Sequence, residues 1–144
     1  MTIYTIGFTK RSAENFFETL KDNDISKIID IRINNTSHLA SFAKKEHLEY
    51  FLKELCNLEY YYYPDLAPTN ELFKNYKKEK IGWEDYEQEF ISLLEKRRVK
   101  DAITEKDLTN ACMLCSEFDV KNCHRRLVAE YFADHFVESK IVHL

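Results

Sequence analysis

The chain has 144 residues, 44% of them hydrophobic and 32% charged, values typical of a globular protein with one buried core. No apolar run is long enough to cross a bilayer, so we expect no membrane segment. Its 21 basic and 25 acidic side chains give a net charge of −4, which excludes a strong overall field for nucleic acid but not a local basic pocket. We predict a single domain over residues 1–144.

The numbers of glycine and cysteine residues exclude further classes of protein. With only two glycines and two prolines, the chain contains no Gly-rich phosphate loop, no Rossmann fingerprint and no Walker sequence. No basic region followed by an apolar segment stands after Met1, so a secretory signal is not indicated and we expect a cytoplasmic protein. Its four cysteines are then expected to be reduced thiols.

The first third of the chain predicts a strand, a helix and a second strand. Residues 2–7 form a β-branched run ending at Gly7, Ser12 is placed to cap a helix, and residues 25–31 form the second strand. This order predicts a right-handed parallel unit. A polar loop at 34–37 then leads to another helix, whose apolar stripe consists of Leu48, Phe51, Leu52 and Leu55.

A second crossover is expected to end in an aromatic strand. Residues 58–63 include four consecutive tyrosines and stop before Pro64, which cannot continue a central ladder. Stacking of nucleic-acid bases on these rings is one interpretation. We favour packing in the core, with the hydroxyl groups on polar partners at the layer edge, because both faces of a covered strand meet helices.

The second half of the chain continues the alternation. The lysines between residues 74 and 80 are typical of a solvated helix face, and a lid over an anionic ligand is the alternative. A long helix from Trp83, a strand at 111–115, a helix starting near residue 123 and a strand at 140–144 follow. We predict a three-layer α/β fold, with a mostly parallel sheet of about five strands and helices on both faces.

Polar residues gather at the carboxyl ends of the predicted strands, where sheets of this kind bind ligands. They are Gly7, Thr9, Asp30, Arg32, Asp65, Cys115 and Glu117, followed by Cys123, His124, Arg125 and Arg126 at the start of a helix. The convergence of these residues predicts a functional site at one rim of the sheet.

The start of that helix is electrostatically unusual. If Asn122 is the N-cap, a histidine and two arginines occupy the first turn, where the helix dipole disfavours each cation by roughly 0.3–1 kcal/mol. A negative group is therefore expected nearby. It is either an internal carboxylate, from Asp30, Glu117 or Asp119, or a bound anion.

Four short motifs resemble a known family. They are Thr5-Ile6-Gly7, Asp30-Ile31-Arg32, Cys115-x-Glu117 and Cys123-His124-Arg125-Arg126, and together they are similar to the domain of unknown function 488 (DUF 488) family essentially end to end. The segment Leu66-Ala67-Pro68-Thr69, with Trp83 and Tyr86, resembles one branch of it. Many members have His where Phe8 stands here, so a role for an imidazole at that position is absent. The resemblance implies no settled activity.

The first interpretation of the site is an enzyme, a hydrolase or transferase acting on a small phosphorylated, nucleotide-like or nucleobase-like compound, or on a flipped base. The anion would be held by Arg32, His124, Arg125, Gly7 and Thr9, with Asp30 or Glu117 as general acid or base and Cys115 or Cys123 as nucleophile. We expect Cys123 to be the better nucleophile, because a helix N-terminus and neighbouring cations lower the pKa of a thiol.

A metal centre is the second interpretation, since Cys112, Cys115, Cys123 and His124 count to four zinc ligands. We expect no metal, because strand alternation directs residues 112 and 115 to opposite faces and residues 123 and 124 diverge by about 100° at a helix start. We predict no cofactor.

Two further interpretations need no catalysis. In the first of them, the chain is a module that binds nucleic acid or protein through its lysines and tyrosines. In the second, the side chains of Asp30, Arg32, Glu117 and Arg125 form a buried ion network that fixes the sheet edge. The sequence does not indicate an oligomeric state.

Overall fold

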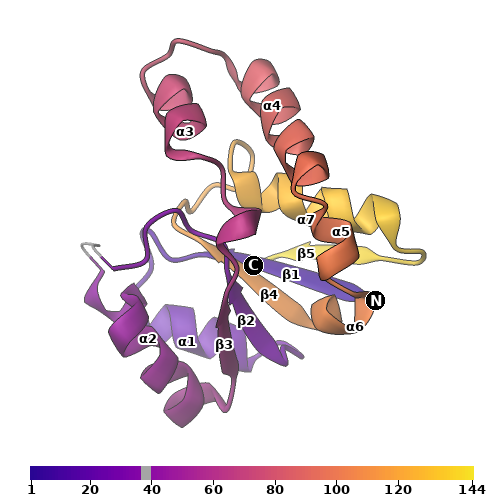
Figure 1. Ribbon diagram of the computed structural model, residues 1–144. Helices are drawn as coiled ribbons and strands as arrows, with labels where there is room; N and C mark the ends of the chain where they lie inside the picture. Colours follow the sequence, from indigo (N-terminus) through magenta and orange to yellow (C-terminus); the bar gives the residue numbers. More distant parts are fainter. Residues whose placement is uncertain (37–39) are drawn as a thin grey trace.

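A parallel five-stranded sheet in the order β3-β2-β4-β1-β5 forms the centre of the protein, as described by a computed structural model for residues 1–36 and 40–144 (Figure 1). The strands are β1 (Thr2–Gly7), β2 (Lys27–Asp30), β3 (Glu59–Tyr62), β4 (Ala111–Cys115) and β5 (Lys140–His143). Each neighbouring pair is parallel, so the carboxyl ends of all five strands lie along one edge.

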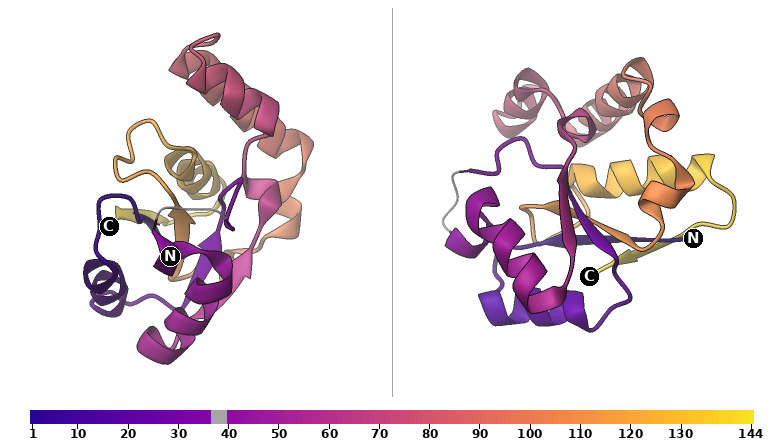
Figure 2. Two further views of the ribbon diagram at one scale, coloured as in Figure 1. Left: turned by 90° about the vertical axis from the view of Figure 1, so that its left-hand side faces the viewer. Right: turned by 60° about the horizontal axis from the view of Figure 1, so that its bottom comes forward.

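Helices cover both faces of this sheet. They are α1 (Ala13–Lys21), α2 (Lys45–Phe51), α3 (Asn70–Lys77), α4 (Trp83–Lys96), α5 (Val99–Ala102), α6 (Glu105–Leu108) and α7 (His124–His135). A π-helix, Leu52–Cys56, extends α2, and two 3-10 turns span Ser41–Ala43 and Pro64–Leu66. Figure 2 shows α1 and α2 on one side of the sheet and α4 and α7 on the other, which confirms the predicted three-layer α/β fold.

The two faces of the sheet have separate apolar cores because successive strand residues point to opposite sides. Ile29 and Met113 pack with Phe90 and Phe132 from the α4 and α7 layer. On the other face, Ile28, Cys112 and Leu114 pack with Phe16, Leu48 and Leu52 from the α1 and α2 layer. This alternation separates the environments of Cys112 and Cys115, as the sequence predicts.

Side-chain caps begin α1 and α3, and the first of them is the cap that the sequence predicts. The Ser12 hydroxyl accepts a hydrogen bond from the Asn15 amide at 3.0 Å and begins α1. The Thr69 hydroxyl accepts from the Leu72 amide at 3.1 Å and begins α3. The second of these caps sets the residue at which α3 begins.

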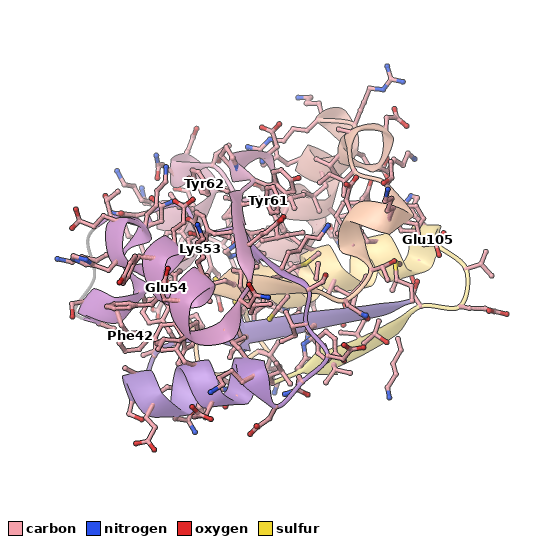
Figure 3. All side chains as sticks on the ribbon, turned by 90° about the horizontal axis from the view of Figure 1, so that it is seen from below. Phe42, Lys53, Glu54, Tyr61, Tyr62 and Glu105 are labelled. Carbon is pink, nitrogen blue, oxygen red and sulfur yellow. The ribbon has the colours of Figure 1, made fainter. Side chains whose placement is uncertain are left out.

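The tyrosine strand differs from its prediction. β3 is an edge strand, and the expected core packing holds for Tyr60 and Tyr63, which pack against the two cores, but is wrong for Tyr61, which is 39% exposed (Figure 3). An edge strand of a twisted sheet has only part of each face covered. The hydroxyl groups do reach polar partners, since Tyr60 donates to Asp30 at 2.5 Å and Tyr62 donates to the Arg32 carbonyl oxygen at 3.2 Å.

Two remaining expectations are the polar loop at residues 34–37 and the absence of a membrane-spanning segment. The predicted polar loop at 34–37 is described up to Thr36, and residue 37 lies outside the described residues. Within residues 1–36 and 40–144, no helix has the length and apolar character that a membrane crossing requires.

Candidate functional site

A cavity of about 400 Å³ opens at the carboxyl edge of the sheet, bounded by α3 and by the loop between β4 and α7. Its aromatic wall consists of Phe73, Tyr76 and Tyr86, and α3 also contributes Asn70, Lys74 and Lys77. Cys115, Cys123 and His124 line its buried end and are only 5%, 2% and 6% exposed. The cavity therefore lies where the sequence predicts a site, and two of its buried lining residues carry thiols.

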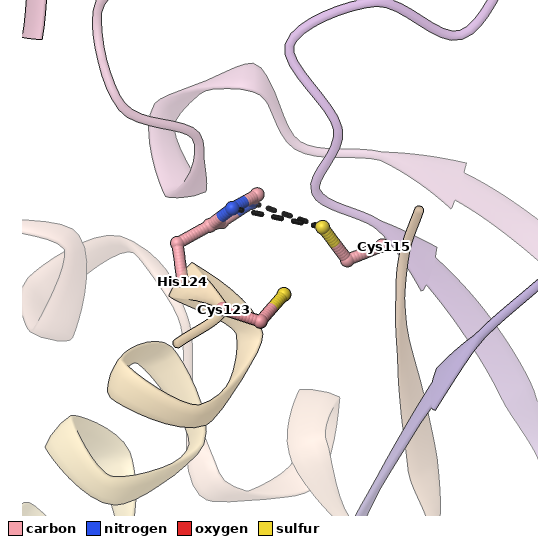
Figure 4. A group of neighbouring side chains, drawn as sticks. All are labelled: Cys115, Cys123 and His124. Atoms are coloured by element: carbon pink, nitrogen blue, oxygen red, sulfur yellow. Dashed lines mark hydrogen bonds between the residues drawn. The ribbon is translucent and has the colours of Figure 1, made fainter. Parts of the chain in front are cut away.

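These three side chains form a compact cluster (Figure 4). Their donor atoms all lie within 4.8 Å of one another, and the Cys115 Sγ is 3.6 Å from Nδ1 and 3.8 Å from Nε2 of His124. The Nε2 atom lies 2.7 Å from the Ile31 carbonyl oxygen, which can only accept a hydrogen bond. Nε2 is therefore the protonated nitrogen of the neutral ring, and Nδ1 has a free lone pair.

The cluster forms because α7 begins one residue later than predicted. Cys123, not Asn122, is the N-cap, and its extended backbone (φ −125°, ψ 138°) is not helical. The expected divergence of about 100° applies to two residues inside a helix, so it does not hold for an N-cap and the next residue. The side chains of Cys123 and His124 therefore lie close together, and the expectation that they diverge is wrong.

The thiols of Cys115 and Cys123 have pKa values shifted in opposite directions. The pKa of the Cys115 thiol is lowered, chiefly by a hydrogen bond from Cys123 and also by the charge of Arg125 and the amides of Ser116 and Glu117, against the effect of burial. The pKa of Cys123 is raised because it donates that hydrogen bond and is buried. Burial also lowers the pKa of His124.

Asp30 and Arg32 form a buried pair rather than an open anion site. Arg32 donates to both carboxylate oxygens of Asp30 at 2.8 Å and to the Ala43 carbonyl oxygen at 2.7 Å. The Arg32 guanidinium also lies 5.4 Å from the centre of the Phe8 ring. Arg32 is 1% exposed and Asp30 is fully buried, so these contacts fix the end of β2, and Arg32 also lines the cavity.

Arg125 fixes the loop between β4 and α7. Its guanidinium donates to the carbonyl oxygens of Glu117 and Phe118, the latter at 3.2 Å, and its Nε lies 3.4 Å from the Thr5 hydroxyl. It is 1% exposed. Arg125 is thus satisfied by neutral loop carbonyl oxygens and not by one of the expected carboxylates, while Arg126 lies 3.5 Å from Glu130.

Gly7 and Thr9 support the same loop from β1. A Cβ atom at Gly7 would lie 1.7 Å from the Glu117 carbonyl oxygen, so only glycine allows this approach. The amide and hydroxyl of Thr9 both donate to the Ser116 carbonyl oxygen. Neither residue lines the cavity, which makes them supports of the cavity wall rather than parts of its surface.

Glu117 lies at the entrance to the cavity. Its carboxylate is half exposed and lies 3.3 Å from the Lys77 ammonium group, so this pair joins the loop to α3. Lys74 and Lys77 both line the cavity, which supports the lid alternative for these two lysines. Sequence reasoning did not select Asn70, Phe73 or Tyr76, although their spacing of three residues along α3 places them on one side of the helix.

The fold and the site define a class of parallel α/β proteins that place buried thiols and an imidazole at the carboxyl edge of the sheet. Comparison with protein families identifies the group within this class. The family described as "Domain of unknown function DUF488" matches residues 12–132, so the chain belongs to the DUF488 family. This match leaves out β1 with its Thr-Ile-Gly motif, and is therefore shorter than the expected end-to-end resemblance. Comparisons with curated proteins and with solved structures gave no match.

Proposed function

We propose that this protein is an enzyme of the hydrolase or transferase class that acts on a small, flat, anionic compound of the nucleotide or nucleobase-like kind. The observation that carries the proposal is a cavity of ligand size, about 400 Å³, with a thiol beside an imidazole at its buried end. Membership of the DUF488 family supplies no activity of its own, so the proposal depends on the chemistry of this cavity.

The walls of the cavity support the substrate class. Phe73, Tyr76 and Tyr86 provide aromatic faces against which a planar heterocycle can pack. Lys74 and Lys77 bring positive charge to the same cavity in a chain whose net charge is −4. A flat ring and a negative group are the two features that such walls recognise together.

In the proposed reaction, Cys115 is the nucleophile and His124 is the base. The Ile31 carbonyl oxygen accepts from Nε2, which leaves Nδ1 unprotonated, and a turn of the ring brings its lone pair to the Cys115 Sγ, which lies 3.6 Å from Nδ1 and 3.8 Å from Nε2. The thiol proton passes to Nδ1 while Sγ forms a bond to an electrophilic carbon or phosphorus atom. The leaving group departs with the electron pair of its broken bond and takes the proton from His124. Water, or a second acceptor, then releases the group from sulfur.

The remaining predicted site residues have positioning roles in this proposal. Asp30 and Arg32 hold the end of β2, whose next residue, Ile31, orients His124. Arg125 and Gly7 hold the loop that carries Glu117. Glu117 acts at the entrance of the cavity through its contact with Lys77, and Asp30 is too deeply buried to exchange protons with a ligand.

Alkylation with iodoacetamide in the presence of EDTA tests the proposal. We expect Cys115 to be modified first and nucleoside monophosphates or free bases, tested singly, to slow the reaction at least fivefold. Cys56→Ser is the control, because Cys56 lies outside the cavity and is half-buried in the π-helix Leu52–Cys56. Peptide mass mapping identifies the modified site. Slow modification of Cys115 in the native protein, or a rate that none of these compounds changes, would contradict the proposal.

A non-enzymatic binding module is the second candidate, and one observation favours it. Both buried arginines of the site, Arg32 and Arg125, donate to the protein itself, as a structural network would require. Such a module would bind single-stranded nucleic acid through exposed lysines, including Lys78 and Lys80. Its affinity would fall steeply with added salt, whereas Cys115→Ser would leave it unchanged. Fluorescence anisotropy with a labelled oligonucleotide at several salt concentrations separates the two candidates.

A further inference from the structure

The three donor atoms at the buried end of the cavity match a metal site that the sequence argued against. Among the described residues, Cys115, Cys123 and His124 are the group of potential ligands whose donor atoms lie within 4.8 Å of one another. They come from the end of β4 and the start of α7, two segments held together by Arg125 and by the close approach at Gly7. The cluster therefore rests on a fixed scaffold rather than on mobile surface side chains.

One separation between ligand atoms matches tetrahedral zinc, and binding would require the imidazole to turn, because the Cys115 Sγ lies nearly as close to Nε2 of His124, at 3.8 Å, as to Nδ1. With Zn–S near 2.3 Å and Zn–N near 2.0–2.1 Å, a tetrahedral site places sulfur and nitrogen about 3.6 Å apart. The Cys115 Sγ and the His124 Nδ1 are 3.6 Å apart. Cys112, the fourth cysteine or histidine considered from the sequence, packs in the core on the other face of the sheet and takes no part.

The surroundings of the ligands are also those of a metal site. Histidines that bind metals generally donate their second ring N–H to a carbonyl or carboxylate, and the Nε2 of His124 donates to the Ile31 carbonyl oxygen at 2.7 Å. The amides of Ser116 and Glu117 donate to the Cys115 sulfur. All three ligand residues line the cavity, so a bound ion would have one position open to it.

We propose that Cys115, Cys123 and His124 form a three-ligand site for a thiophilic divalent cation, Zn²⁺ above all, with its fourth position open to the cavity. Two thiolates and one imidazole select such ions over Mg²⁺ and Ca²⁺, which prefer oxygen ligands. Binding releases the protons of the two thiols. Since a coordinated Cys115 sulfur cannot attack a substrate, the ion would switch off the thiol reaction proposed above.

A Co²⁺ titration of the whole chain, treated with chelator and kept under a phosphine reductant, tests the site without any substrate. We expect one equivalent of Co²⁺ to produce a thiolate-to-cobalt charge-transfer band in the near ultraviolet, and one equivalent of Zn²⁺ to remove it. Cys123→Ser and His124→Gln should each weaken binding at least tenfold, and Cys56→Ser should leave it unchanged. Circular dichroism verifies that each variant is folded.

A second measurement keeps the proposal testable if a ligand variant fails to fold. In the wild-type chain, Zn²⁺ should slow the alkylation of Cys115 at least tenfold and leave that of Cys56 unaffected, while Mg²⁺ changes neither rate. Absence of the charge-transfer band in the wild-type protein, or a band that survives unchanged in both folded ligand variants, would overturn the metal site. The proposed function is judged separately, by protection of Cys115 in EDTA.

Discussion

At the scale of single residues, Gly7 links β1 to the loop that forms the cavity. A Cβ atom there would lie 1.7 Å from the Glu117 carbonyl oxygen and 3.0 Å from the Arg125 guanidinium. Both atoms belong to the support of the cavity wall, so an added methyl group must displace the loop. The conformational freedom of glycine matters less here than its lack of a side chain.

Gly7→Ala should therefore destabilise the protein by about 1–3 kcal/mol, the usual range for overpacking a filled site. The free energy of unfolding in urea measures the change. Gly82→Ser is the matched control, because a Cβ at Gly82 meets nothing within 4 Å and serine is a favourable residue at the N-cap of α4. Equal stability of the two variants would contradict the assigned role of Gly7.

Substitutions at Asp30 and at its partner Tyr60 distinguish a structural role of Asp30 from a catalytic role. Asp30→Asn leaves the buried Arg32 without its counter-charge and should cost about 3–5 kcal/mol of stability. Tyr60→Phe removes one hydrogen bond to the same carboxylate and should cost about 1.5–3 kcal/mol. Urea unfolding gives both values. If Asp30→Asn abolished activity and left stability unchanged, Asp30 would instead be a catalytic residue.

At the scale of elements, α3 contributes to the site because it lies over the carboxyl edge of the sheet. Lys77 pairs with Glu117 across the entrance of the cavity, with both side chains about half exposed. Exposed pairs of this kind contribute less than about 1 kcal/mol to stability. The effect of Lys77 should therefore appear in ligand binding rather than in folding.

Lys77→Gln should weaken binding of whichever nucleoside monophosphate protects Cys115 by about fivefold, equivalent to roughly 1 kcal/mol, and leave the melting temperature nearly unchanged. Lys80→Gln is the control, since Lys80 is exposed and does not line the cavity. Isothermal titration calorimetry provides the two affinities. A similar loss in both variants would mean that general charge, not the position of Lys77, attracts the ligand.

At the scale of the whole molecule, the stability of the fold should depend on pH through β5. Burial, then the charges of Arg125 and Arg126, lower the pKa of His143 from its ordinary value of 6.5, and its Nδ1 lies 2.6 Å from the Thr5 hydroxyl. The unfolded chain thus binds the proton more readily than the folded one. Stability should fall as the pH drops from 6.5 toward the lower pKa of the folded state.

His143→Gln should reduce the slope in this window without abolishing it, because the pKa of the buried His124 is lowered as well and that group still titrates. His47→Gln is the control for the loss of an exposed histidine, since the His47 side chain is 50% exposed on α2. Thermal unfolding at pH 5, 6 and 7 measures the slope. An unchanged slope in His143→Gln would show that other groups produce it.

The sequence by itself determined the order of the elements and the edge of the sheet at which the site lies. Periodicity and capping residues such as Ser12 are local properties, so they could be read without knowledge of the fold. Parallel strands in turn bring Gly7, Asp30 and Cys115 to one edge whatever their order. Strand alternation correctly separated Cys112 from Cys115 for the same local reason.

Only the tertiary structure decided which groups face the cavity and which serve the scaffold. Arg125 has the residue type of a ligand-binding group but donates to loop carbonyl oxygens and does not line the cavity, whereas Arg32 pairs with Asp30 and lines the cavity as well. The position of β3 at the sheet edge likewise follows from strand order, which no local pattern encodes. The convergence of Cys115, Cys123 and His124 depends on a helix start displaced by one residue, because the backbone of a single N-cap determines the direction of its side chain.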